Sequence, residues 1–145
     1  MTIIILICWI LYSCIEGTQD GYFYHYRNTT TELKNENIHW NYFLGRGFIL
    51  SLISITHFLL YESYLSAGLY VTGLALLFSF FHNGAYYQTR KKLSDGKFYA
   101  LGWMSNSTSS QATLELKWKA RVWLAVIGAL AILTSFNINF LNKII

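Results

Sequence analysis

Residues 65–82 read LSAGLYVTGLALLFSFFH, an apolar run of helical length that ends in a histidine. A membrane-spanning helix needs about 20 mainly apolar residues, with a usable range of about 17–25, and this run meets that length. It therefore predicts a helix inside a membrane. The histidine at its end raises the question of what a polar group does there, because lipid makes such groups costly.

Three further apolar stretches predict three further spans, so that we expect membrane helices over about residues 2–24, 42–61, 65–87 and 120–141. The first has a short apolar core and crosses only if the aromatic stretch up to Tyr24 continues it into the headgroup layer. The second reaches the required length only if it begins at Tyr42. Since residues 1–4 contain no basic residue, a cleaved secretory signal is not indicated, and we expect the first helix to be retained.

The composition agrees with a membrane protein rather than a water-soluble domain. Of the 145 residues, 54% are hydrophobic and 12% are charged, whereas soluble domains carry about 25% charged residues. The chain contains no proline, which favours long helices without kinks. We therefore predict an all-α fold: one transmembrane domain over residues 1–145, built as an integral membrane four-helix bundle.

The two long connections carry weaker local signals. In the first, Thr29 and Glu32 have the spacing of a helix capping box, which predicts a short surface helix. In the second, Asp95-Gly96 between apolar residues predicts a turn or a small hairpin. The apolar residues that follow this turn are too numerous for a free linker, so we expect them to fold against the membrane surface or a partner.

The positive charges are placed asymmetrically and predict the orientation of the chain. Ten of the eleven Lys and Arg residues lie in or beside the connections 25–47 and 88–121, and the exception is Lys143. Positively charged connections stay in the cytoplasm, so both termini are expected outside the cytoplasm, in a plasma or inner membrane. The basic residues flank span ends, and the predicted partners are therefore the lipid bilayer and other membrane subunits or further copies, with no nucleic acid.

Acids and histidines inside or beside the spans form the candidate functional centre. Residues three and four apart share one face of a helix, and the first and third spans run in the same direction. Polar residues near the cytoplasmic ends of the spans are therefore expected to meet: Glu16, Asp20, Arg46, His82, Asn83 and Arg90. His57 lies eleven residues beyond Arg46, roughly 16 Å deeper, so we expect it apart from His82, with Ser54 and Tyr61 as secondary polar candidates.

Three interpretations of this centre are open from the sequence. The first is a structural network, because two acids and two arginines balance in charge and buried charges pair with one another. The second is a divalent metal site with Glu16, Asp20 and His82 as ligands, joined by His25, since carboxylate and imidazole ligands suit zinc or non-haem iron. A haem held between His57 and His82 is disfavoured by their difference in depth.

The third interpretation is a proton or ion path along a file of polar side chains, because histidine titrates near neutral pH. Its members would be Glu16, Asp20, Ser54, His57 and Tyr61. We favour none of the catalytic readings: the sequence predicts a structural or interaction subunit of a homo-oligomer or of a larger membrane complex. The alternatives are a membrane-embedded metal-dependent enzyme and a proton-conducting or ion-conducting protein.

The predicted orientation can be tested with single-cysteine variants in a background that lacks Cys8 and Cys14. A cysteine at position 145 should react with a membrane-impermeant maleimide in intact cells. A cysteine at position 95 should react only after permeabilisation, because the basic connections hold it inside. Labelling in the opposite pattern, or a glycan on Asn28 or Asn106, would show that the orientation is reversed.

Overall fold

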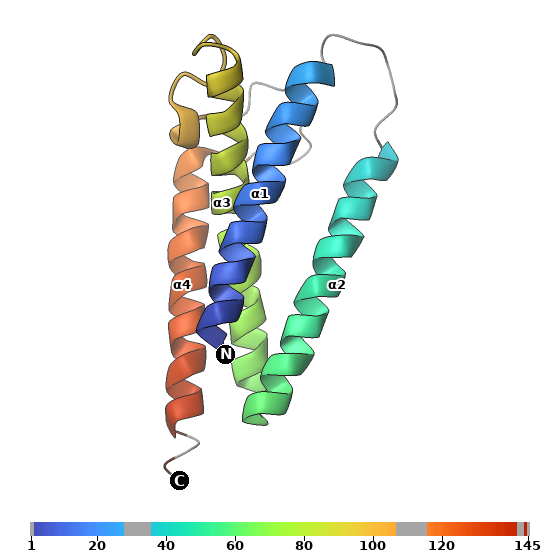
Figure 1. The fold of residues 1–145 in the computed structure, drawn as a ribbon. Helices are drawn as coiled ribbons and strands as arrows, with labels where there is room; N and C mark the ends of the chain where they lie inside the picture. Colours follow the sequence, from blue (N-terminus) through green and yellow to red (C-terminus); the bar gives the residue numbers. More distant parts are fainter. Residues whose placement is uncertain (1, 28–35, 107–115, 142–143, 145) are drawn as a thin grey trace.

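The computed structural model describes residues 2–27, 36–106, 116–141 and 144, with backbone alone for residues 27 and 36–41. Four long helices run alternately up and down (Figure 1). They are α1 (Thr2–Arg27), α2 (Glu36–Tyr61), α3 (Tyr64–Leu93) and α4 (Trp118–Leu141), and a short 3-10 helix, η1 (Gly102–Met104), lies between α3 and α4. The described part of the chain contains no strand.

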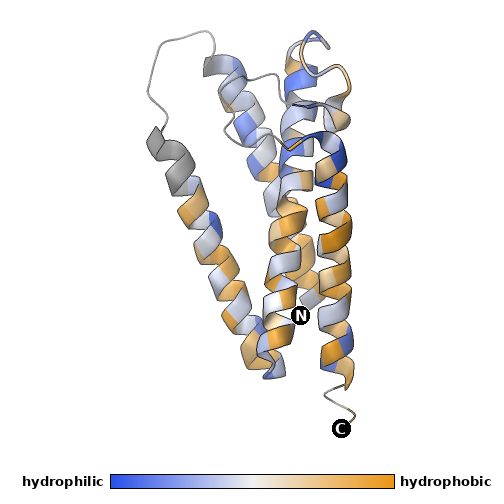
Figure 2. Cartoon of the chain, turned by 180° about the vertical axis from the view of Figure 1, so that it is seen from behind, coloured by the Kyte–Doolittle hydropathy of each residue, from blue (hydrophilic) through white to orange (hydrophobic). Residues whose placement is uncertain are grey.

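All four long helices are long and apolar enough to cross a membrane, which confirms the predicted all-α fold with four spans. Both chain ends lie at one end of the bundle (Figure 1). The more hydrophilic residues of α1 and α3, and the connection after α3, lie at the other end (Figure 2). The bundle therefore has the polarity that the charge distribution predicts, with an aromatic and basic layer opposite the termini.

Two helices extend beyond the spans that hydropathy predicts. α2 begins at Glu36 rather than Tyr42, and α3 continues to Leu93 rather than ending near residue 87. Arg90, Lys91 and Lys92 occupy the last turn of α3, where positive charge is favourable near the negative end of the helix dipole. Hydropathy cannot detect these turns, because a helix can continue into water once its apolar residues are used up.

The link between α2 and α3 is a two-residue turn. Glu62 adopts a left-handed conformation with φ of 51°, and its N–H donates to the Phe58 carbonyl at 2.7 Å. Ser63 then caps α3 by accepting a hydrogen bond from the Ser66 N–H at 3.2 Å. This turn brings the end of α2 against the start of α3, where the Phe58 and Tyr64 rings stack at 4.2 Å.

Glycines set the spacing between the three closely packed helices. A Cβ on Gly17 of α1 would collide with the His82 backbone of α3, and one on Gly73 of α3 would lie 2.6 Å from the Gly128 carbonyl oxygen of α4. Gly17 belongs to the small-residue series with Ser13 and Gly21 on α1. Without a hydrophobic driving force in lipid, helices associate through such close backbone approach. The glycines therefore fix both the distance and the rotation of α1 and α4 against α3.

The interior is small, and most large apolar side chains point outward. The buried apolar cluster consists of Trp9, Tyr70, Leu74, Leu77 and Ile132. Exposed Leu, Ile and Phe side chains are numerous on α1, α2 and α4, whereas on α3 Leu65 and Tyr64 at its start are exposed. Such exposure is expected when hydrocarbon rather than water surrounds the protein. α2 is the most exposed helix: in Figure 1 its first half leans away from α1, and its C-terminal end approaches α3.

The connection after α3 folds back onto the bundle. Ser94 ends α3, its hydroxyl donating to the Arg90 carbonyl and accepting from the Phe98 N–H, and the turn continues through Gly96 with φ of 79°. In the described residues this is a turn followed by η1, so the predicted hairpin is absent there. The Trp103 ring fills the space that the missing side chain of Gly84 leaves. The capping-box residues of the first connection lie outside the described residues.

Close packing between α3 and α4 should make Gly73 intolerant of larger residues. We expect Gly73→Leu to lower the free energy of unfolding by about 1–3 kcal/mol, because the added side chain forces α3 and α4 apart. The matched control is Gly68→Leu on the same helix, where a Cβ meets open space. Unfolding of both purified variants in mixed micelles measures the difference, and equal stability would contradict the proposed helix spacing.

Candidate functional site

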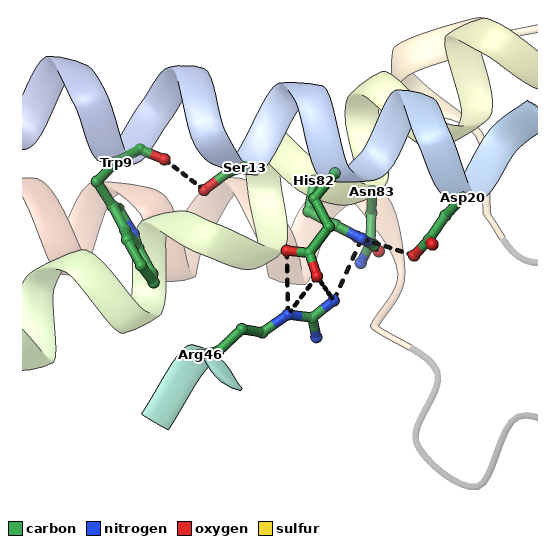
Figure 3. Close-up of polar contacts among 7 residues, drawn as sticks. Trp9, Ser13, Asp20, Arg46, His82 and Asn83 are labelled. Atoms are coloured by element: carbon green, nitrogen blue, oxygen red, sulfur yellow. Dashed lines mark hydrogen bonds and ion pairs between the residues drawn. The ribbon is translucent and has the colours of Figure 1, made fainter. Parts of the chain in front are cut away.

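Three helices contribute side chains to one polar cluster, which we call the ion-pair cluster. Its members are Glu16 and Asp20 from α1, Arg46 from α2, and His82 and Asn83 from α3 (Figure 3). Glu16 and Asp20 are one helical turn apart and share a face. Gly17 lies on the α1 surface that contacts α3, and it brings the α1 backbone against that of His82. The absence of a side chain at position 17 is therefore what lets the Asp20 carboxylate reach the histidine.

The strongest contact in the cluster joins α1 to α2. The Arg46 Nη2 donates to Glu16 Oε1 at 3.0 Å, and Nε lies 3.2 Å from both Oε1 and Oε2. This two-pronged geometry is the favourable one for a guanidinium and a carboxylate. The Glu16 side chain is 6% exposed and the Arg46 side chain is 27% exposed. The pair is thus shielded on its acidic side and partly open on its basic side.

His82 connects this ion pair to Asp20. Its Nε2 lies 3.1 Å from Asp20 Oδ2 and 3.5 Å from Arg46 Nη2, and its Nδ1 lies 3.2 Å from Asn83 Oδ1. Both ring nitrogens therefore face an oxygen acceptor, and a ring that carries both protons would donate a hydrogen bond to each. The Phe78 ring stacks on the His82 ring at 4.9 Å, and the Arg46 guanidinium lies over the Phe78 ring at 4.4 Å.

The structure does not place every predicted site residue in this cluster. Arg90 is buried two turns further along α3, where its guanidinium lies over the Tyr99 ring at 5.9 Å. His25 contacts the Tyr26 ring. His57 and Tyr61 lie together near the other end of α2, as their depth predicts, and Ser54 is half-buried between the two groups. The predicted pairing of Arg90 with an acid therefore has no counterpart among the described contacts.

His57 belongs to a second cluster at the end of the bundle that holds the termini. Its Nε2 lies 2.9 Å from Ser66 Oγ, 3.3 Å from Ser135 Oγ and 3.2 Å from Asn139 Nδ2. The ring stacks on Tyr70 at 4.5 Å. Helix α4 thus supplies two buried polar residues to this cluster, Ser135 and Asn139. The signal that could have revealed them is the four-residue spacing of Ser135 and Asn139 in an otherwise apolar run.

The two halves of α3 place their small and polar residues differently. Gly68, Thr72 and Ala75 are exposed, whereas Ser66 and Tyr70 are buried against α2 and α4. The small residues that precede His82 at helical spacing therefore point away from the bundle. His82 and Asn83 themselves do reach the ion-pair cluster.

An apolar layer separates the two clusters. Trp9 and Leu74 lie in this layer, and the Trp9 indole donates to the Leu74 carbonyl at 2.8 Å. The Ser13 hydroxyl donates to the Trp9 carbonyl. Phe78 and Leu77 pack around them. In the described part of the chain, polar side chains do not form a continuous file between Glu16 and His57. The described geometry therefore gives little support to a proton or ion path through one copy of the bundle.

The ion-pair cluster is poorly arranged for a metal. Among the described residues, no three His, Cys, Asp or Glu side chains gather as metal ligands would. Glu16 directs both carboxylate oxygens at Arg46 instead, and a guanidinium beside them repels a cation. The geometry therefore favours the structural network over the metal site with Glu16, Asp20 and His82. Comparisons with protein-family models, with characterised proteins and with solved structures gave no match.

Removing one partner of the ion pair should be asymmetric in its cost. We expect Arg46→Gln to destabilise more than Glu16→Gln, because it leaves the more buried charge without a partner. The free energy of unfolding should fall by about 2–4 kcal/mol in Arg46→Gln and by about 1–2 kcal/mol in Glu16→Gln. The double variant should be about as stable as Glu16→Gln alone.

Chemical unfolding of the four proteins in mixed micelles measures this cycle. Glu62→Gln serves as the control, since this carboxylate is exposed in the turn between α2 and α3. Additive losses from the two single variants, or a loss from Glu62→Gln as large as that from Arg46→Gln, would contradict a specific pair.

Proposed function

We propose that this protein is a small polytopic membrane subunit that assembles with copies of itself or within a larger membrane complex. The observation that carries the proposal is the state of α2. Only 6% of its apolar stretch is fully buried inside the bundle, while Ile49, Leu50 and Ile53 pack against the core in part. Polar contacts of Arg46 and His57 hold the helix in place. A span that is fixed in place and exposed along one side is available to a neighbouring helix.

The outward surface of α2 contains a pair of small residues among its exposed apolar side chains. Gly47 and Ser51 are both exposed and lie four residues apart, and a Cβ at Gly47 would meet open space. Small residues at this spacing let a second helix approach closely in lipid. α3 offers a similar exposed series in Gly68, Thr72 and Ala75. Two of the four helices therefore carry surfaces suited to association.

The competing classes receive less support from the same contacts. An enzyme would need reactive groups that a substrate can reach, whereas the carboxylates of the ion-pair cluster already have partners within the chain. A conductor would need a polar path, and the apolar layer around Trp9 interrupts it. We also propose, from the basic residues at the end opposite the termini, that both termini lie outside the cytoplasm of a plasma or inner membrane.

The subunit proposal predicts a specific effect of Gly47→Leu. Each chain is labelled with one fluorophore and reconstituted in liposomes at low protein density. Single fluorescent spots of the parent should then lose their signal in more than one bleaching step. Gly47→Leu should shift the population towards single steps, because a bulky side chain blocks close helix approach, while unfolding of the monomer stays unchanged. Leu59→Met, an equally exposed position on α2, serves as the matched control.

Two results would contradict this proposal. One is a parent that bleaches in single steps at every density and copurifies with no other membrane protein. The other is a complex whose distribution of bleaching steps is the same in the parent and in Gly47→Leu. The α2 surface would then play no part in the assembly.

A further inference from the structure

A second group of charges lies buried at the basic end of the bundle, and it does not use the ion-pair cluster. The Arg121 guanidinium lies over the Tyr87 ring at 5.0 Å, that ring lies 4.8 Å from Tyr99, and Arg90 lies over Tyr99. We call these four residues the arginine layer. Arg121 is 1% exposed and Arg90 is 6% exposed, so two positive charges are withdrawn from water within a few side chains of each other.

The hydrogen bonds of Arg121 are only partly satisfied. One nitrogen, Nη2, donates to the carbonyl oxygens of Ser105 and Trp103, which ties the start of α4 to the connection after α3. Its Nε and Nη1 are buried and have no partner, and the same is true of the Ser105 hydroxyl beside it and of Arg90 Nε. Several donors in one layer are therefore left without an acceptor.

Counter-charge is also missing from this layer among the described side chains. The buried carboxylates of the ion-pair cluster, Glu16 and Asp20, are committed to Arg46 and His82. A buried guanidinium without an anion is strongly unfavourable, and buried charges in proteins are normally paired. Aromatic rings supply part of the stabilisation through cation–π contact, but a ring accepts no strong hydrogen bond from Nε or Nη1.

The depth of the layer points to the chemistry of the missing anion. Lys117 and Lys119 are exposed at the start of α4, and Trp123 is exposed one turn later. Basic and aromatic residues in this order mark the headgroup region of a bilayer. Basic sites between membrane helices at this level bind the phosphates of anionic lipids, and arginine forks match phosphate oxygens well.

We propose that Arg121 and Ser105 form a binding site for a phosphate group, which is supplied by the headgroup of an anionic phospholipid or by free phosphate. The free Nε and Nη1 of Arg121 and the hydroxyl of Ser105 donate to the phosphate oxygens. Arg90 adds a second positive charge to the same layer. The connection 94–106 meets the site at Trp103 and Ser105, whose carbonyls accept from Arg121, and Leu101 and Met104 of the same connection are exposed.

The test measures binding of four probes to the intact chain in micelles: inorganic phosphate, phosphatidylglycerol, diacylglycerol and phosphatidylcholine. Thermal unfolding reports each affinity, since a ligand of the folded state raises the melting temperature. We expect phosphatidylglycerol to stabilise the parent more than phosphatidylcholine and diacylglycerol do. Stabilisation by inorganic phosphate as well would identify free phosphate as a sufficient source, whereas its failure would assign the site to lipid.

Variants then locate the effect. Arg121→Gln should weaken phosphatidylglycerol binding about tenfold, the loss expected for charge-assisted hydrogen bonds. Ser105→Ala removes the hydroxyl but keeps the carbonyl that Arg121 holds, and it should weaken binding about threefold. Lys119→Gln is the matched control, because it removes one exposed positive charge from the same helix.

Three results would overturn the proposal. They are a parent that binds phosphatidylglycerol no better than phosphatidylcholine, an equal loss of binding in Lys119→Gln and Arg121→Gln, and unchanged binding in Ser105→Ala if Arg121→Gln does not fold. The first would mean that no anionic lipid is recognised. The second would mean that diffuse surface charge is responsible, and the third would leave the buried donors without a role.

Discussion

The contact between Glu16 and Arg46 is the constraint on which the position of α2 in the bundle depends. Helices α1, α3 and α4 approach one another through glycines, and hydrogen bonds also join them, such as that from the Trp9 indole to the Leu74 carbonyl and that between the Ser66 and Ser135 hydroxyls. The position of α2 has a different origin, because little of its apolar surface is buried in the bundle. An ion pair with α1 in the first half of the helix and the His57 contacts with α3 and α4 near its C-terminal end hold it against the core. Polar contacts inside lipid thus do here what apolar burial does in soluble proteins.

This arrangement connects the fold with both proposals. A helix that is held at two points and exposed between them can receive a neighbouring span without rearrangement of the bundle, which is the basis for a role as a subunit. The arginine layer lies apart from these contacts, at the level where lipid headgroups are found. Carboxylates satisfy Arg46 and His82 from within the chain, whereas Arg121 retains free donors. The two groups of buried charge therefore differ in what they need from outside the protein.

The sequence predicted the four spans and most of the ion-pair cluster, because both follow from rules that act along one helix. Apolar length locates a span, and the spacing of Glu16 and Asp20 places both on one face. The partners of His57 were not predictable in this way. Helix rotation decides whether Ser66 or Thr72 of α3 points inward, and rotation is fixed by the contact between Gly73 and Gly128, which joins residues far apart in the chain. The direction of Arg90 was not predictable for the same reason: among the described contacts its guanidinium lies over the Tyr99 ring.

The most direct test of the central claim is the distance between α1 and α2 with and without the ion pair. Cys8 and Cys14 are first replaced by serine, and spin labels are attached at Leu11→Cys and Phe48→Cys, both exposed positions. Pulsed electron paramagnetic resonance then measures the distance between the two labels in liposomes. The account predicts one narrow distance distribution for the parent. It predicts a longer and broader distribution when Arg46→Gln is added, because the first half of α2 then loses its contact with α1. An unchanged distribution in Arg46→Gln would show that α2 is held by something other than the Glu16–Arg46 contact, and it would contradict the account.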